Sequence, residues 1–188
     1  LLPDPLADAT RRQVLTALTV SEAPTATSLA ALEAQMDGEL GAQAALAVGA
    51  QAGKLADVEP EATGSALETL IARFQGATTL AERRMALQAL GNSGDPRVLP
   101  LLVSVIEGGD LMLAPIAAYG LRFMPSGPAD DVLARLIAVG GPTGVQAVRA
   151  TVWRDAGFWL PRLQAARAHF ADDTTIAEAI DRALRRFG

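Results

Sequence analysis

The sequence contains no cysteine, and this absence excludes disulfide bonds and thiolate metal sites. A cysteine-free chain suits a reducing cytosol and an oxidising periplasm equally, so the compartment stays open. Lysine occurs once, at Lys54, and the other positively charged side chains are arginines. This preference for arginine, together with abundant alanine, favours a GC-rich bacterial genome as the source.

Aromatic residues and long hydrophobic runs are also scarce. Aromatic side chains make up 4% of the 188 residues, although 50% of the residues are hydrophobic. The apolar content is therefore mostly Ala, Leu and Val, which is typical of helices that pack closely. No uncharged apolar run reaches the roughly 18 residues that a membrane-spanning helix needs, so we expect no membrane span.

Residues that could carry out chemistry are few. His169 is the only histidine, and we expect it near a helix C-terminus, where a partial positive charge suits the helix dipole. The carboxylate pairs at 130–131 and 172–173 stand at predicted helix starts, where they suit exposed N–H groups. The glycine-rich stretches at 91–94 and 140–144 match no phosphate-binding loop. We therefore predict no enzyme activity, no catalytic residue, no metal site and no cofactor.

The charge balance is acidic, with a net charge of −5. Nucleic-acid binding needs a basic face, so this balance argues against DNA or RNA as a partner. Arginines nevertheless recur along the chain, and we expect solvated ladders with Asp95, Asp131 and Asp155. A groove for an acidic partner is the alternative reading. These arginines are Arg83, Arg84, Arg97, Arg135, Arg149 and Arg162.

The secondary structure is predicted to be helical throughout. No segment alternates apolar and polar residues over the length of a strand, so we predict no β-strand. Apolar residues instead recur every three or four positions between breaks rich in Gly, Pro and Asp. We expect Asp4 and Pro5 to open the first helix. Further helices are predicted at 24–36, 39–55, 60–74, 80–90, 97–106, 111–123, 129–139, 144–154, 158–170 and from 174 or 175 onward.

The helices recur as similar units. Leu90 matches Leu121 and Ile106 matches Ile137 at an offset of 31 residues, and residues 67–74 match residues 99–106 at an offset of 32. Offsets in the thirties with helix–turn–helix content are typical of an α-solenoid. We predict an all-α solenoid of about five to six antiparallel helix pairs, in which residues 1–188 form one domain and a single right-handed arc.

Stability is expected to come from stacking, because each unit alone leaves an apolar face uncovered. Residues 1–5, Leu-Leu-Pro-Asp-Pro, read as a linker that enters a domain, so we expect the chain to be part of a longer protein. The expected core includes Leu70, Phe74, Leu87, Leu90, Leu102, Ile106, Leu121, Leu133, Leu136 and Ile137.

The units resemble HEAT repeats. Residues 90–102, Leu-Gly-Asn-Ser-Gly-Asp-Pro-Arg-Val-Leu-Pro-Leu-Leu, are similar to the end of the first helix, the turn and the start of the second helix in that family. Residues 144–150, Gly-Val-Gln-Ala-Val-Arg-Ala, resemble its Val-Arg entry into the first helix. The resemblance implies a helical array, but it does not indicate a particular function.

A narrower resemblance covers residues about 24 to 155 and concerns the helical domain of vitellogenin and microsomal triglyceride transfer protein, the large lipid transfer proteins. It depends on Ala-Pro-Thr at 23–25, Ala-Leu-Ala-Val-Gly at 45–49, Leu-Gly-Asn-Ser-Gly at 90–94 and Ala-Ala-Tyr-Gly-Leu-Arg at 117–122. The lipid cavity of that family also needs β-sheet domains, and none is predicted here. The resemblance therefore implies an arched helical layer and not lipid transport.

Two stretches are candidates for contact with a partner. Residues 111–116 carry no charge, so they are either buried between repeats or in contact with another domain or chain. Aromatic residues gather with an arginine at 153–159, where they either anchor a partner or fill the junction between the last hairpins. The candidate partner-binding residues are therefore Leu111, Met112, Leu113, Trp153, Arg154, Phe158 and Trp159.

The predicted function is that of a non-catalytic scaffold that binds another protein or domain. An array of hairpins without a nucleophile, a base and an orienting group favours this hypothesis. The alternative is the helical layer of a protein that handles lipid or another hydrophobic ligand. A HEAT-like glycosylase that acts on DNA is a third hypothesis, which the acidic charge balance opposes.

Overall fold

The computed structural model describes residues 5–188, apart from the side chains of residues 5–8, 11, 12 and 19. Within this part of the chain there are eleven α-helices, two short 3-10 helices and no β-strand, so the all-α prediction is confirmed. None of the described helices is both long and apolar enough to cross a membrane. The chain divides between Ser93 and Gly94 into two compact units, and the single domain expected from the sequence stays a prediction.

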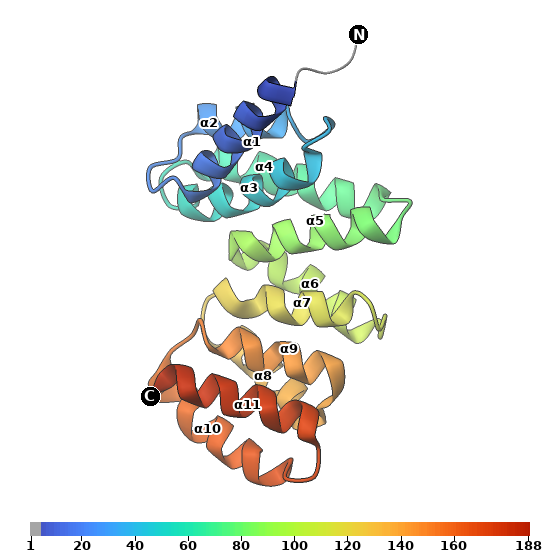
Figure 1. Cartoon of the computed structure of the whole chain (residues 1–188), viewed down its shortest axis with the longest axis vertical. Helices are drawn as coiled ribbons and strands as arrows, with labels where there is room; N and C mark the ends of the chain where they lie inside the picture. Colours follow the sequence, from blue (N-terminus) through green and yellow to red (C-terminus); the bar gives the residue numbers. More distant parts are fainter. Residues whose placement is uncertain (1–4) are drawn as a thin grey trace. The chain divides into compact units, whose positions relative to one another are not determined.

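Helix α3 is central to the first unit, because it packs against each of the other four helices there. Its inner face is formed by small side chains, among which Ala44, Ala47, Val48 and Ala52 are fully buried. The helices of this unit are α1 (Pro5–Val20), α2 (Ala26–Glu33), α3 (Gly41–Leu55), α4 (Pro60–Gly76) and α5 (Leu80–Ser93) (Figure 1).

The predicted start of helix α2 at Pro24 is wrong by two residues, because Thr25 caps the helix. The Thr25 Oγ1 atom accepts a hydrogen bond from the Ser28 amide at 3.1 Å, and Ser28 Oγ accepts one from the Thr25 amide at 3.0 Å. This reciprocal pair satisfies two donors that a helix start leaves free. Asp4, the predicted cap of α1, lies outside the described residues.

Helix α3 approaches α5 closely, since glycines occupy the contact. A Cβ atom added at Gly49 would overlap the carbonyl oxygen of Ala89, and one added at Gly53 would overlap that of Ser93. The two glycines lie one turn apart on α3, so they form a strip against which the backbone of α5 rests. Sequence periodicity does not reveal this strip, because glycine in a helical pattern reads as a break.

Eight helical segments build the second unit, and its first turn follows the prediction. Gly94 has the left-handed φ of 62° that ends a helix. Asp95 then accepts a hydrogen bond from the Arg97 amide at 2.9 Å and caps the next element. The segments are η1 (Pro96–Val98), α6 (Leu99–Glu107), α7 (Ala114–Gly120), η2 (Leu121–Phe123), α8 (Pro128–Val139), α9 (Gly141–Thr151), α10 (Ala156–His169) and α11 (Thr174–Phe187).

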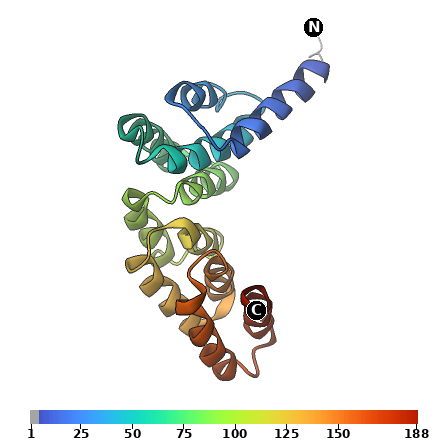
Figure 2. The ribbon, with the colours of Figure 1, turned by 90° about the vertical axis from the view of Figure 1, so that its left-hand side faces the viewer.

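Three helices of the second unit lie side by side in the order α7, α9, α11 (Figure 1). Helix α6 packs against α7, α8 against α9, and α10 against α11. Figure 2 shows the helices of this row nearly end-on, with α8 and α10 to their left. Helices α6, α8 and α10 thus cover one face of the row, and the other face carries a groove lined by α7, α9 and α11.

The core prediction is largely confirmed. Ile106 and Leu136 differ from it, since both are only half-buried. The remaining eight predicted core residues are buried, four in each unit: Leu70, Phe74, Leu87 and Leu90, then Leu102, Leu121, Leu133 and Ile137.

Candidate binding groove

The uncharged stretch at 111–113 forms a turn and not the first turn of a helix, which corrects the prediction. The Asp110 carboxylate accepts hydrogen bonds from the amides of Met112 at 2.8 Å and Leu113 at 3.1 Å, and these bonds hold the turn before α7. Leu111 is 84% exposed and Met112 is 51% exposed, whereas Leu113 is buried. Leu113 therefore belongs to the core and presents no surface to a partner.

The aromatic stretch at 153–159 is also divided by the structure. Trp153 is 60% exposed, and Phe158 is half-buried beneath the guanidinium of Arg162. Trp159 is buried, and the side chain of Arg154 is 3% exposed. Arg154 and Trp159 thus lie in the interior, which is the junction-filling alternative that the sequence left open. Only Trp153 and part of Phe158 remain available at the surface.

Arg154 is held by a buried network. Its Nε atom donates to Asp130 Oδ1 at 2.5 Å, and its Nη1 atom donates to the carbonyl oxygens of Leu121 at 3.0 Å and Met124 at 2.8 Å. The Trp159 indole donates to the same Asp130 oxygen at 3.1 Å. The network joins the ends of η2, α8, α9 and α10, so its role is to fix the turns of the second unit.

Asp130 keeps its charge in this interior position. Burial alone would raise the pKa of the Asp130 carboxyl, but the hydrogen bonds from Arg154, the Gly127 amide and Trp159 hold this pKa below its usual value. The Gly127 amide donates to Oδ2 at 3.0 Å. Because the pKa is lower in the folded state, the ionised carboxylate stabilises the fold at neutral pH.

The contribution of Asp130 to stability is expected to disappear in acid. It is fully present above the unfolded-state pKa of about 3.9 and is lost as the pH falls through the lower folded-state pKa. We therefore expect Asp130→Asn to be less stable than the wild type at pH 7 and the difference to narrow below about pH 4. Urea unfolding at neutral and acid pH measures the free energy of unfolding of both proteins. A difference between them that stays constant with pH would contradict a stabilising role for the ionised Asp130 carboxylate.

A groove of about 440 Å³ lies on the row of α7, α9 and α11, and it is the best candidate for a binding site. Gln146, Arg149 and Trp153 follow one another along one side of α9 and the turn after it, at the spacing of a single helix face. Arg182 and Arg186 stand one turn apart on α11, and Tyr119 contributes from α7. Val152, Ala179 and Ala183 complete the lining.

The groove is positively charged within an acidic protein. Three arginines line it, and none of its lining residues is acidic. Among the described residues Arg149 and Arg186 form no ion pair, and Arg182 reaches only Glu178, at 4.0 Å and in an exposed position. Guanidinium groups that line one groove with no carboxylate in the lining repel one another, so an anion in the groove would relieve that repulsion.

Aromatic rings line one end of the groove. The Trp153 ring meets the edge of Phe123 with ring centres 5.5 Å apart. The Arg122 guanidinium lies between two rings, 4.3 Å from the centre of Tyr119 and 4.4 Å from that of Phe123. These contacts fix Tyr119 and Phe123, so the exposed face of Trp153 rests on an ordered base.

The sequence indicates only part of this groove. Arg149 and Trp153 are among the residues that it singles out, whereas Arg182 and Arg186 are missed. The sequence signal that could have found these two arginines is their spacing of four residues on the polar face of the last helix. A polar face considered for one helix alone is expected to face solvent, so the pair was not recognised as part of a site. The ladders predicted for Asp131 and Asp155 are absent from the described residues, where Asp155 instead caps α10 by accepting from the Phe158 amide at 2.7 Å.

A second hollow, of about 330 Å³, lies between α8 and α10. Its walls are mainly apolar and include Ile137, Leu163 and Phe170, while Arg162 and His169 add polar groups. It is therefore chemically unlike the groove on α9 and α11. Its lining suits a hydrocarbon group more than a polar segment.

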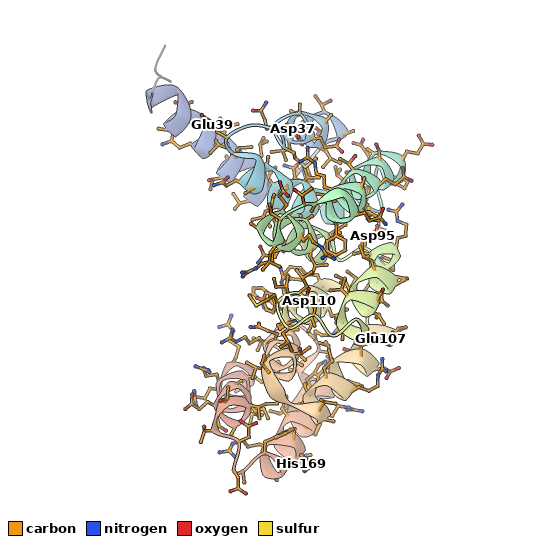
Figure 3. The ribbon with its side chains drawn as sticks, turned by 90° about the vertical axis from the view of Figure 1, so that its right-hand side faces the viewer. Asp37, Glu39, Asp95, Glu107, Asp110 and His169 are labelled. Carbon is orange, nitrogen blue, oxygen red and sulfur yellow. The ribbon has the colours of Figure 1, made fainter. Side chains whose placement is uncertain are left out.

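The histidine of the second unit lies apart from the carboxylates near the start of that unit. His169 ends α10, as expected from the sequence, and lies far from Asp95, Glu107 and Asp110 of the same unit (Figure 3). Asp173 caps α11 by accepting from the amides of Thr175 and Ile176. No three His, Asp or Glu side chains gather in an arrangement that could hold a metal ion within residues 5–188.

Comparisons with known protein families, with curated proteins and with solved structures give no match to the chain.

Proposed function

We propose that this chain is a non-catalytic protein-interaction scaffold whose docking site is the groove on α7, α9 and α11. The observation that carries the proposal is the combination, in one groove whose lining has no acidic residue, of three arginines and an exposed tryptophan. Tryptophan and arginine are the residue types most enriched at the energetic centres of protein interfaces. The groove therefore offers both an apolar contact and a directional charged one.

A HEAT-like repeat architecture is part of this proposal. It is supported by the packing of alternate helices within each unit, α3 against α5 in the first and α7, α9 and α11 in the second. Stacked hairpins bring equivalent helices together in this manner, and such stacks present continuous surfaces to partners. The glycine strip of α3 and the buried alanines fit the close helix approach that stacking needs.

A hydrophobic-ligand function is the second candidate, and the hollow between α8 and α10 favours it. Its walls are apolar, as is usual for small-molecule sites, and its volume of about 330 Å³ lies within the range of such sites. Native mass spectrometry of the purified chain tests this candidate. A retained lipid-sized mass would support it, and the mass of the bare chain would remove it.

Site-specific photo-crosslinking tests the scaffold proposal. We expect a photoreactive amino acid at position 153 and one at position 186 to capture the same protein in cells of the source organism. The control position is Val139, which is 83% exposed and does not line the groove. Capture that is equal from all three positions, or absent from 153 and 186, would contradict docking in this groove.

A further inference from the structure

The chemistry of the groove identifies the class of segment that it binds. We propose that the partner supplies an acidic, extended peptide segment whose carboxylates pair with Arg149, Arg182 and Arg186 beside the Trp153 ring. This inference rests on the function proposed above. The juxtaposition that carries this inference is three exposed guanidiniums, contributed by two packed helices, with no carboxylate among the residues that line the groove.

Local charge, and not the charge of the whole chain, decides what enters the groove. The net charge of −5 repels an anionic partner at long range. At an ionic strength of about 0.1 M the screening length is about 10 Å, so groups that line the groove dominate the interaction with a bound segment. Arg186 lies in the last turn of α11, where the helix dipole favours a cation, and Arg182 lies one turn before it.

The spacing of the arginines matches an extended chain. Arg182 and Arg186 are four residues apart on α11, which corresponds to a rise of about 6 Å. Alternate side chains of an extended peptide point the same way and lie about 6.6 Å apart. Carboxylates at positions i and i+2 of such a segment can therefore meet both arginines at once. Arg149 faces the same groove from α9 and can pair with a neighbouring carboxylate.

Arginine in place of lysine adds geometric selectivity. The planar guanidinium binds a carboxylate with two parallel hydrogen bonds, which a lysine ammonium cannot do. Trp153 and its edge contact with Phe123 provide an apolar surface at the end of the groove. The segment is thus expected to carry a hydrophobic residue next to its acidic run, and the tryptophan ring covers that residue.

A peptide fits this groove better than a nucleic acid. Nucleic-acid sites neutralise many phosphates along a basic face. Here three arginines stand in a single groove, and the chain as a whole carries more acidic than basic residues. Nucleic acid and anionic membrane are therefore treated as competing outcomes of the experiment.

The test uses fluorescence anisotropy with the full chain and a labelled peptide in which Glu alternates with Ser and one Leu follows. The groove variant is Arg149→Gln/Arg182→Gln/Arg186→Gln. The matched control is Arg84→Gln/Arg135→Gln/Arg185→Gln, which changes the net charge equally at exposed positions outside the groove. Circular dichroism confirms that both variants fold. We expect the groove variant to bind at least about tenfold more weakly than the control, which should match the wild type.

A peptide with Gln in place of Glu provides the complementary arm, and we expect it to bind at least about tenfold more weakly than the Glu peptide. Equal binding of the two peptides, or equal loss in both arginine variants, would overturn the inference. Tighter groove-dependent binding of an oligothymidylate or of phosphatidylglycerol vesicles would also overturn it. If the crosslinks at 153 and 186 capture a partner while the Glu peptide does not bind, the scaffold function stands and the acidic-segment inference fails.

Discussion

Replacing Arg154 by alanine is expected to lower the free energy of unfolding of the second unit by about 3–5 kcal/mol. The change leaves the Asp130 carboxylate buried without its cation, and it also removes the donor to the Leu121 and Met124 carbonyl oxygens. Breaking one side of a buried ion pair costs more than the pair itself contributes, since the remaining charge stays in the interior. Four chain segments meet at this network, so no single helix can relax independently.

Tryptophan fluorescence measures this effect, because Trp153 and Trp159 are the only two tryptophans and both belong to the second unit. Urea unfolding followed at this signal gives the change in free energy. Arg162→Ala is the matched control, as Arg162 is exposed and lies 3.6 Å from the centre of the Phe158 ring. We expect this control to lose at most about 1 kcal/mol. If Arg154→Ala and Arg162→Ala cost the same, the network does not stabilise the fold as described.

The double substitution Gly49→Ala/Gly53→Ala is expected to destabilise the first unit by about 2–6 kcal/mol, or about 1–3 kcal/mol per site. In an ordinary helix interior the same change stabilises by roughly 0.5–1 kcal/mol, so the two effects have opposite signs. Here each added methyl would overlap a backbone carbonyl of α5, which cannot turn aside as a flexible side chain does. The helices must then separate, and the alanines between them lose their contacts.

Urea unfolding followed by circular dichroism measures how the double substitution changes the free energy of unfolding. Gly76→Ala is the control, since a Cβ atom at Gly76 would have no atom within 4 Å. This control is expected to be as stable as the wild type. A double variant that is equally stable, or more stable, would show that α3 and α5 do not pack along the glycine strip.

Local sequence chemistry predicts the helices well because the signals that begin and end them are short-range. Asp95 and Asp173 cap the elements that they precede, and Gly94 adopts the left-handed conformation expected at a helix end. The exceptions are also local in origin. The Asp110 carboxylate accepts hydrogen bonds from two amides and delays the start of α7, and Thr25 caps α2, which begins at Ala26 and not at Pro24.

The direction of neighbouring side chains at a turn could not be predicted in this way. Trp153 and Arg154 are adjacent in the turn after α9. Trp153 is exposed, whereas the side chain of Arg154 is buried because it pairs with the Asp130 carboxylate. Asp130 comes from another helix, so its pairing depends on tertiary packing. The groove could be predicted only in part, since Arg149 and Arg186 come to line the same hollow only when α9 packs against α11.

The most direct test of the docking groove is a nuclear magnetic resonance titration of the isotopically labelled chain with the alternating Glu peptide. The groove proposal predicts that amide shifts change on α9 and its following turn, between Gln146 and Trp153, and on α11, between Ala179 and Arg186. It further predicts that these changes vanish in the Arg149→Gln/Arg182→Gln/Arg186→Gln variant. Shifts confined to the hollow between α8 and α10, to the first unit, or to no region at all would contradict it.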